Sequence, residues 1–266
     1  MRIHKLNYSN TNTYLIEGDS DSGKLLFDTG WAGTFPAFCR AMGEIRIPVQ
    51  DINFILISHF HPDHMGIAQD IADQGPVILA ADVQKDFLHS SDAIFFREKN
   101  TAFRSIEDDK VRFFSLTDSR KTLREIGIAG QILHTPGHSD DSISLMLDDG
   151  NLFVGDLNPL YELELHEGTQ IGESWQRLLA LEPKVVYYGH AEKAVLSEER
   201  QQTKDSDLYA LVSEIMRLID KRCDVRKIQK KTGADSVFIQ DVMRMYLTHQ
   251  NVGVQGILDR IEIKNR

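Results

Sequence analysis

The stretch Ser58-His59-Phe60-His61-Pro62-Asp63-His64 places three imidazoles and one carboxylate within six positions. It follows residues 54–57, an apolar run typical of a buried strand, and precedes residues 65–72, where apolar residues recur at helical spacing. Imidazole nitrogens combined with a carboxylate suit zinc and, less selectively, manganese or iron. Pro62 removes one backbone N–H and stiffens the segment. We therefore predict a metal site in the loop at the end of a strand, with a helix beginning at Met65.

Four other strand-like runs end beside a residue that could bind a metal. The runs are residues 25–27, 132–133, 152–154 and 185–188, and the residues after them are Asp28, His138, Asp156 and His190. Each of these residues has a glycine within two positions, and glycine lets the backbone turn sharply and approach an ion closely. A single Asp or His at a strand end is usually a turn or capping residue. Five strand ends that all offer such a residue indicate one shared site.

In chain order these motifs are Asp-Thr-Gly, His-x-His-x-Asp-His, Pro-Gly-His, Gly-Asp and Gly-His. The series resembles that of the metallo-β-lactamase superfamily and covers residues 1–200. The resemblance implies an α/β (α+β) fold, a four-layer αββα sandwich with a binuclear metal site at one edge of its two sheets. It also implies the ligands: His59, His61 and His138 for the first metal, Asp63, His64 and His190 for the second, and Asp156 as the bridge between them. Asp28 would lie behind the ligands and orient one of them.

Two metal ions held in this way imply a hydrolase. A metal-bound hydroxide would attack a carbonyl or phosphoryl centre, and the metals would stabilise the developing oxyanion. Asp63 would orient this nucleophile and shuttle a proton, so that Asp63 and Asp28 are the candidate catalytic residues. We expect Zn²⁺ at both positions, with iron or manganese as alternatives. The two cysteines, Cys39 and Cys223, lie outside the motifs, so neither a Cys-rich metal site nor a disulfide framework is expected.

Charge and composition narrow the class of substrate. The chain has 266 residues and a formal charge of −10. Residues 1–200 contain 18 basic and 31 acidic residues, a balance of −13, which argues against a long nucleic-acid groove on this region. We expect a small acyl ester, thioester or lactone as the substrate. No apolar run approaches the ~20 residues needed to cross a bilayer, and the N-terminus has no signal-peptide pattern, so we expect a cytoplasmic protein without a membrane partner.

From about residue 207 the sequence becomes helical. We predict helices over residues 208–218, 225–231 and 236–249, and a strand or a frayed tail over residues 252–263. The boundary is placed near residues 199–204, which gives a catalytic domain over 1–200 and a helical domain over 201–266. The second and third helices have the lengths of a helix-turn-helix. Residues 201–266 have a formal charge of +3, from 12 basic and 9 acidic residues. A small helical cap or a homodimer contact is the simpler interpretation.

Three alternatives to the acyl hydrolase stay open. A phosphodiesterase or nuclease could use the same metal site. A persulfide dioxygenase would use a single iron, which the two ligand sets disfavour. A regulator would use its metal domain to sense a ligand and its C-terminal helices to bind DNA.

Two features have no role that the sequence reveals. Six phenylalanines fall in residues 87–114, where they could wall a substrate pocket or simply pack in the core. The pair Asp140-Asp141 follows the Pro-Gly-His-Ser segment without a chemical interpretation.

Overall fold

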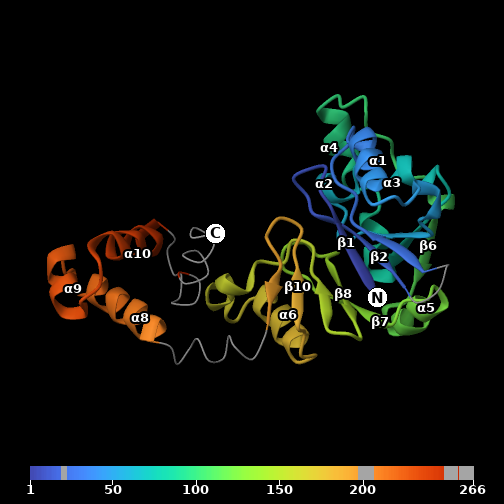
Figure 1. The fold of residues 1–266 in the computed structure, drawn as a ribbon. Coiled ribbons are helices and arrows are strands. Elements are labelled where there is room, and N and C mark those ends of the chain that lie inside the picture. Colours follow the sequence, from blue (N-terminus) through green and yellow to red (C-terminus); the bar gives the residue numbers. More distant parts are fainter. Residues whose placement is uncertain (19–22, 197–206, 249–256, 258–266) are drawn as a thin grey trace. The chain divides into compact units, whose positions relative to one another are not determined.

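The computed structural model describes the chain except for residues 19–22, 197–206, 249–256 and 258–266 (Figure 1). The chain forms two compact units: Met1–Leu157 with Gln176–Val195, and Asn158–Trp175 with Leu196–Arg266. All five motifs lie in the first unit. The predicted domain boundary at residue 200 lies outside the described residues and stays a prediction.

The first sheet contains six strands in chain order. They are β1 (Arg2–Leu6), β2 (Thr13–Glu17), β3 (Lys24–Phe27), β4 (Phe54–Leu56), β5 (Val77–Ala81) and β6 (Val111–Phe114). β1, β2 and β3 pair antiparallel, whereas β3 to β6 pair parallel. Parallel strands end at the same edge of a sheet, so the segments after β3 and β4 come together. These segments carry Asp28 and the histidine motif.

The second sheet has the order β11-β10-β9-β8-β7. Its strands are β7 (Gly130–His134), β8 (Ile143–Leu147), β9 (Asn151–Phe153), β10 (Val185–Tyr187) and β11 (Ala194–Val195). Only β9 and β10 pair parallel. Asp156 and His190 follow these two neighbouring strands and therefore lie at one edge.

Alternating side chains on the strands build two cores. Phe27 and Leu56 pack between the sheets with Phe153 of the second sheet, and the rings of Phe27 and Phe153 lie 5.5 Å apart. Their neighbours Leu26 and Ile55 point to the opposite face and pack against helices. This period of two is the strand pattern that a sheet buried on both faces requires.

Helices connect the strands of the first unit. They are α1 (Phe35–Glu44), α2 (Pro62–Met65), α3 (Ala68–Ala72), α4 (Asp92–Arg97), α5 (Ser119–Glu125) and α6 (Gln170–Leu179), of which α6 begins in the second unit. Short 3₁₀ helices are η1 (Val49–Asp51), η2 (Asp82–Phe87), η3 (Asp108–Lys110), η4 (Leu116–Asp118) and η5 (Leu160–His166).

The phenylalanine-rich segment serves mainly as core. Phe95 is buried and stacks on Phe103 with 4.0 Å between ring centroids, and Phe87 packs in the same core. Phe114 is buried between the sheets, whereas Phe96 and Phe113 are exposed. Ordinary packing therefore accounts for most of this cluster.

Three helices form a separate small core in the second unit. They are α8 (Asp207–Asp220), α9 (Val225–Thr232) and α10 (Ser236–Thr248), close to the predicted ranges. Asp224 caps α9 by accepting a hydrogen bond from the Lys227 amide, and Gly233 ends it with φ 71°. The strand or tail predicted over residues 252–263 falls almost entirely outside the described residues. Every helix in the described part of the chain is too short or too polar to span a bilayer.

Candidate metal centre

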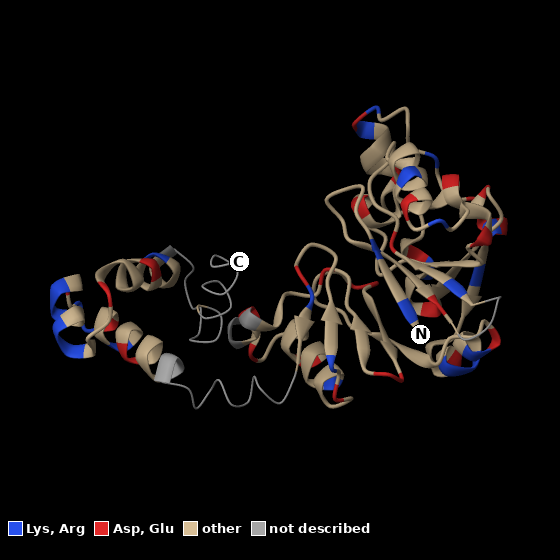
Figure 2. Ribbon diagram, viewed as in Figure 1, with Lys and Arg blue, Asp and Glu red and all other residues tan. Residues whose placement is uncertain are grey.

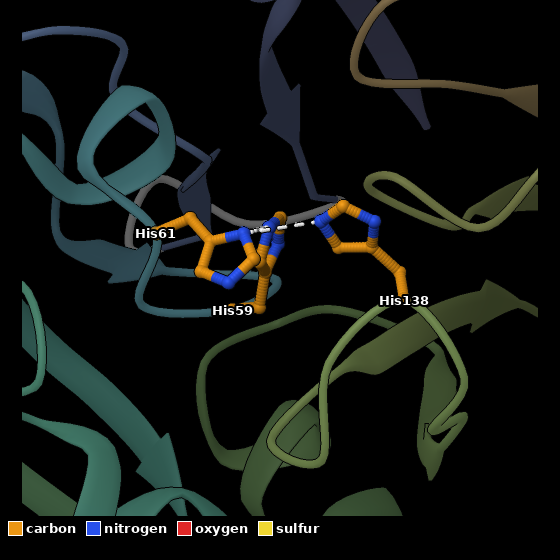
Figure 3. Close-up of side chains that lie close together, drawn as sticks. All are labelled: His59, His61 and His138. Carbon is orange, nitrogen blue, oxygen red and sulfur yellow. Dashed lines mark hydrogen bonds between the residues drawn. The ribbon is translucent and has the colours of Figure 1, made fainter.

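Three histidines from two segments converge on one point. His59 and His61 follow β4, and His138 follows β7 (Figure 3). The Nδ1 atom of His61 lies 3.0 Å from Nε2 of His59 and 3.1 Å from Nε2 of His138. Nitrogen ligands about 2.0–2.1 Å from a tetrahedral zinc lie roughly 3.3 Å apart, so this spacing suits one ion. We call these three residues the first ligand group.

A hydrogen-bond chain fixes which nitrogen of His59 faces the group. The hydroxyl of Ser58 donates to Oδ2 of Asp28 at 2.9 Å. With its proton used in this way, the Ser58 oxygen accepts from Nδ1 of His59 at 3.0 Å. Nε2 of His59 therefore presents its lone pair to the group, as a metal ligand must.

Asp63, His64, Asp156 and His190 form the second ligand group. Oδ2 of Asp63 lies 2.9 Å from Nε2 of His190. Oδ1 of Asp156 lies 3.2 Å from Nε2 of His64, and its Oδ2 lies 3.4 Å from Nε2 of His190. These atoms come from α2 and from the segments after β9 and β10.

Partners behind the imidazoles of the second group set their tautomers as well. Nδ1 of His64 donates to Oδ2 of Asp28 at 2.9 Å, and both side chains are fully buried. Nδ1 of His190 donates to the carbonyl of Asn10 at 3.1 Å. When either ring is neutral, its Nε2 lone pair is then directed at the group.

Asp156 connects the two groups. Its Oδ2 lies 3.6 Å from Nε2 of His138 in the first group and 3.4 Å from Nε2 of His190 in the second. A carboxylate between two cations reduces their mutual repulsion. This placement suits the bridging role predicted for Asp156.

Two buried atoms in the second group fit a cation. Nε2 of His64 and Oδ1 of Asp156 are buried and have no hydrogen-bond partner among the described residues. A lone pair facing a carboxylate oxygen across 3.2 Å is unfavourable unless a proton or a cation lies with them. The donor set of nitrogen and oxygen atoms suits a divalent ion such as zinc.

The charges of the metal-free site follow from burial and these contacts. Burial opposes a charge on His64, but the carboxylates of Asp28 and Asp156 raise its pKa to about 10. Hydrogen bonds with Asp156 and Asp63 raise the pKa of His190 to about 10. Burial, and then the charge of His64, lower the pKa of His59 well below 6.5. Without a cation, His64 and His190 of the second group therefore carry the extra protons, whereas His59 of the first group is neutral.

Local sequence explains how the ligands are presented, and it corrects one prediction. The helix begins at Pro62, not at Met65, so Asp63 and His64 lie in its first turn instead of a loop. Proline suits this position because the first helical N–H needs no partner within the helix. The helix predicted over residues 65–72 is interrupted after Met65 and resumes at Ala68 as α3.

The Asp-Thr-Gly segment holds α2 in place. Thr29 donates to the carbonyl of His64 from both its amide and its hydroxyl, at 2.8 and 2.9 Å. The amide of Gly66 donates to the carbonyl of Gly30 at 2.9 Å. Asp28 itself has φ 61°, a strained conformation for a non-glycine residue that often occurs at functional sites.

Gly189 allows the second group to assemble. A Cβ atom on it would lie 2.4 Å from Oδ1 of Asp156 and 2.8 Å from Cε1 of His64. No larger residue fits there without displacing both ligands.

Sequence reasoning gave no role to two residues that support the site. Ser58 directly precedes the histidine motif, but its contacts with Asp28 and His59 depend on the fold. Asp141 is buried and accepts a hydrogen bond from the Phe60 amide at 2.7 Å. Its proximity to His138 in sequence was the only available signal.

The chain is similar to known proteins in sequence and in fold. The chain is 28% identical over 188 residues to the beta-lactamase-like protein 2 homolog of Drosophila melanogaster, covering 68% of this chain and 58% of that protein. It is 26% identical over 152 residues to the atrochrysone carboxyl ACP thioesterase of Aspergillus fumigatus, covering 55% of this chain and 29% of that protein. The chain spans about half the length of most of the curated relatives that it matches.

Solved structures confirm the predicted αββα fold. The BLEG-1 B3 metallo-beta-lactamase has a TM-score of 0.56 at 22% identity, over 77% of this chain and 97% of that one. The protein TTHA1623, crystallised in a di-iron-bound form, has a TM-score of 0.53 at 24% identity, over 76% of this chain and 98% of that one. The sequence family described as the metallo-beta-lactamase superfamily matches residues 6–190. The chain belongs to this superfamily.

Proposed function

We propose that the chain is a binuclear metal-dependent hydrolase of small acyl esters, thioesters or lactones. The observation that carries this proposal is the pair of ligand groups joined by Asp156. Seven side chains are too many for one tetrahedral ion. His59, His61 and His138 would hold one ion, Asp63, His64 and His190 the other, and Asp156 would contact both. When bound, the ions would lower the pKa of a water and polarise the substrate's carbonyl group.

The two candidate catalytic carboxylates have different positions and therefore different roles. The Asp63 side chain is 22% exposed, so it can reach a substrate, whereas Asp28 is fully buried behind His64. Asp63 orients the attacking water, accepts its proton and passes that proton to the leaving group. The Thr11 hydroxyl, 3.4 Å from Oδ2 of Asp63, helps to hold this carboxylate. Asp28 does not touch the substrate and acts by orienting His64.

Two considerations favour an acyl substrate. The thioesterase among the relatives hydrolyses an acyl thioester, as its name states. The acidic balance of −13 in residues 1–200 disfavours the approach of a polyanion, although salt screens this effect beyond about 10 Å. Zinc is the expected metal because the donor set suits it, and iron is the main competitor because TTHA1623 binds two irons.

A metal analysis combined with a substrate panel tests this function. We expect two metal ions per chain and chelator-sensitive turnover of short acyl esters, thioesters or lactones. His61→Ala and His190→Ala should each abolish most of this turnover, whereas His89→Ala, which changes a half-exposed histidine paired with Asp92 and Asp108, should not. A chelator-sensitive cleavage of bis-phosphodiesters or RNA that outpaces every acyl substrate would instead support a nuclease. One metal or fewer per chain would contradict the binuclear site.

A second candidate function, nucleic-acid binding by the helical unit, is favoured by the charge of α9 and the segment before it (Figure 2). Six basic residues lie between Lys221 and Lys231, against one acidic residue, Asp224. The six are Lys221, Arg222, Arg226, Lys227, Lys230 and Lys231, all exposed. None of them has an ion-pair partner among the described residues. Such a cationic surface suits the phosphate backbone of a nucleic acid.

Fluorescence anisotropy with labelled duplex DNA and single-stranded RNA tests this candidate. Arg226→Gln/Lys230→Gln should weaken binding by about tenfold or more and reduce its salt dependence. The control pair Lys121→Gln/Arg124→Gln neutralises two exposed residues on α5 and should have no effect. Equal effects of both pairs, or no binding by the unmodified chain, would exclude a nucleic-acid site on α9.

A further inference from the structure

Asp141 links the two loops that supply the first ligand group. Its carboxylate, 2% exposed, accepts a 2.7 Å hydrogen bond from the amide of Phe60. Phe60 stands between His59 and His61, so this bond holds the peptide that joins two of the three ligands. Asp141 itself lies three residues after His138, the third ligand.

The loop that carries His138 and Asp141 is tied at both ends. The Thr135 amide donates to the carbonyl of Ser142 at 2.8 Å, and the hydroxyls of Ser139 and Ser142 lie 2.7 Å apart. Nε2 of His134 lies 2.7 Å from the carbonyl of Asp140. The position of the Asp141 carboxylate is therefore fixed relative to His138.

The loop that carries His59 and His61 is held mainly from outside. Nε2 of Gln84, in η2, donates to the carbonyls of Ile57 at 3.0 Å and of Asp141 at 3.2 Å. The amide of Ile143 donates to the carbonyl of Ser58 at 2.8 Å. These bonds fix the loop before His59. Phe60 itself is held at its carbonyl by the Ser91 hydroxyl and at its amide by Asp141, and the Asp141 bond is the one that ties it to the loop of His138.

We propose that Asp141 is a positioning residue that sets the distance between His138 and the His59-Phe60-His61 segment, and so the geometry of the first ligand group. This inference rests on the proposed metal site. A carboxylate suits the task because a hydrogen bond to a charged acceptor is shorter and stronger than one between neutral groups. It also gives the second aspartate of the Asp140-Asp141 pair a role. Asp140 is exposed and contributes its carbonyl only.

Cobalt(II) titration of the full chain tests this role, since the visible spectrum of bound cobalt reports its coordination geometry. Asp141→Ala should weaken metal binding to the three-histidine group by about 10- to 100-fold and change the spectrum of that ion. Asp141→Asn should restore most of the affinity and the spectrum, because its amide oxygen can accept the same hydrogen bond. Asp140→Ala, the matched control, should behave as the unmodified chain.

The outcomes separate the inference from the function on which it rests. If the unmodified chain binds no cobalt, the metal site itself is wrong. If it binds cobalt and a folded Asp141→Ala variant has unchanged affinity and spectrum, only the role of Asp141 is overturned. Should Asp141→Ala fail to fold, Asp141→Glu serves instead: its extra methylene displaces the Phe60 amide, so unchanged cobalt binding in it overturns the proposal equally. A loss of thermal stability with an unaltered spectrum also counts against it.

Discussion

The first ligand group consists of three imidazoles, whereas the second combines two imidazoles with two carboxylates. Asp156 lies between the two groups, and Asp63 adds a further negative charge to the second, whereas the other ligands of the first group are neutral rings. The first group is therefore expected to depend mainly on geometry, through the loops that hold its three rings. The second group is expected to depend mainly on charge.

Both groups have a buried side and an exposed side. His64 is fully buried and is held by Asp28, while the side chains of His138 and His190 are 31% and 38% exposed. The buried side provides rigid support, and the exposed side admits solvent and substrate. Replacing Asp156, which lies between the two groups, should affect both of them. Replacing a residue that supports the ligands of one group, such as Asp28 or Ser58, should affect mainly that group.

The largest effect is expected from Asp156→Asn. The variant loses the negative charge that the two groups share, so repulsion between the cations rises. We expect the metal content to fall from two to one per chain and turnover to fall by more than about 100-fold. Metal analysis and kinetics on the same preparation check this. Full activity with two metals would remove Asp156 from the site.

Gly189→Ala should damage the second group more than the first. Its new Cβ would collide with Oδ1 of Asp156 and with Cε1 of His64. The Asp156 oxygen that lies near His138 of the first group is Oδ2. We expect loss of one metal and a drop in turnover of about 100-fold, with the cobalt spectrum of the first group retained. Gly43→Ala is the matched control: a Cβ there meets nothing within 4 Å, and in α1 it should add about 0.5–1 kcal/mol of stability. If the Gly189→Ala variant still binds two metals, the segment after β10 must be able to move far enough to accept the new Cβ.

Asp28→Asn tests the support behind His64. The variant places an amide where the Asp28 carboxylate accepts hydrogen bonds from His64 and from the Ser58 amide and hydroxyl. One of these donors must then face an N–H group, so His64 loses its fixed orientation. We expect metal affinity of the second group to fall by about 10- to 100-fold, measured by titration with zinc. Asp109→Asn, at an exposed position, should leave the affinity unchanged.

The sequence predicted the α/β pattern and the convergence of strand ends because both depend on local patterns, while the four-layer arrangement followed from the resemblance to the superfamily. Apolar runs locate β3, β4, β9 and β10, and each run is followed within a few residues by a motif. The start of α2 could also have been predicted, because Pro62 with Asp63 in the first turn is a known helix beginning.

Other features were not predictable because they depend on contacts between distant residues. Asp141 meets the Phe60 amide across 81 positions, and no local pattern reveals such a pair. The interruption after Met65 has a similar cause. A Cβ on Gly66 would lie 2.3 Å from the Ala32 nitrogen, so close approach of two backbones decides the path there.

The smallest effect is expected from Ser58→Ala, which tests the support behind the first group. Without the hydroxyl, Nδ1 of His59 loses its partner in a buried site, and an unpaired buried donor costs about 1–3 kcal/mol. His64 keeps its bond to Asp28, so the second group should be little affected. We expect the first group to lose about tenfold in metal affinity, at the low end of such effects, and turnover to fall by a similar factor. Ser90→Ala, an exposed serine, is the control. A larger loss at the second group than at the first would show that Ser58 acts through Asp28 and not through His59.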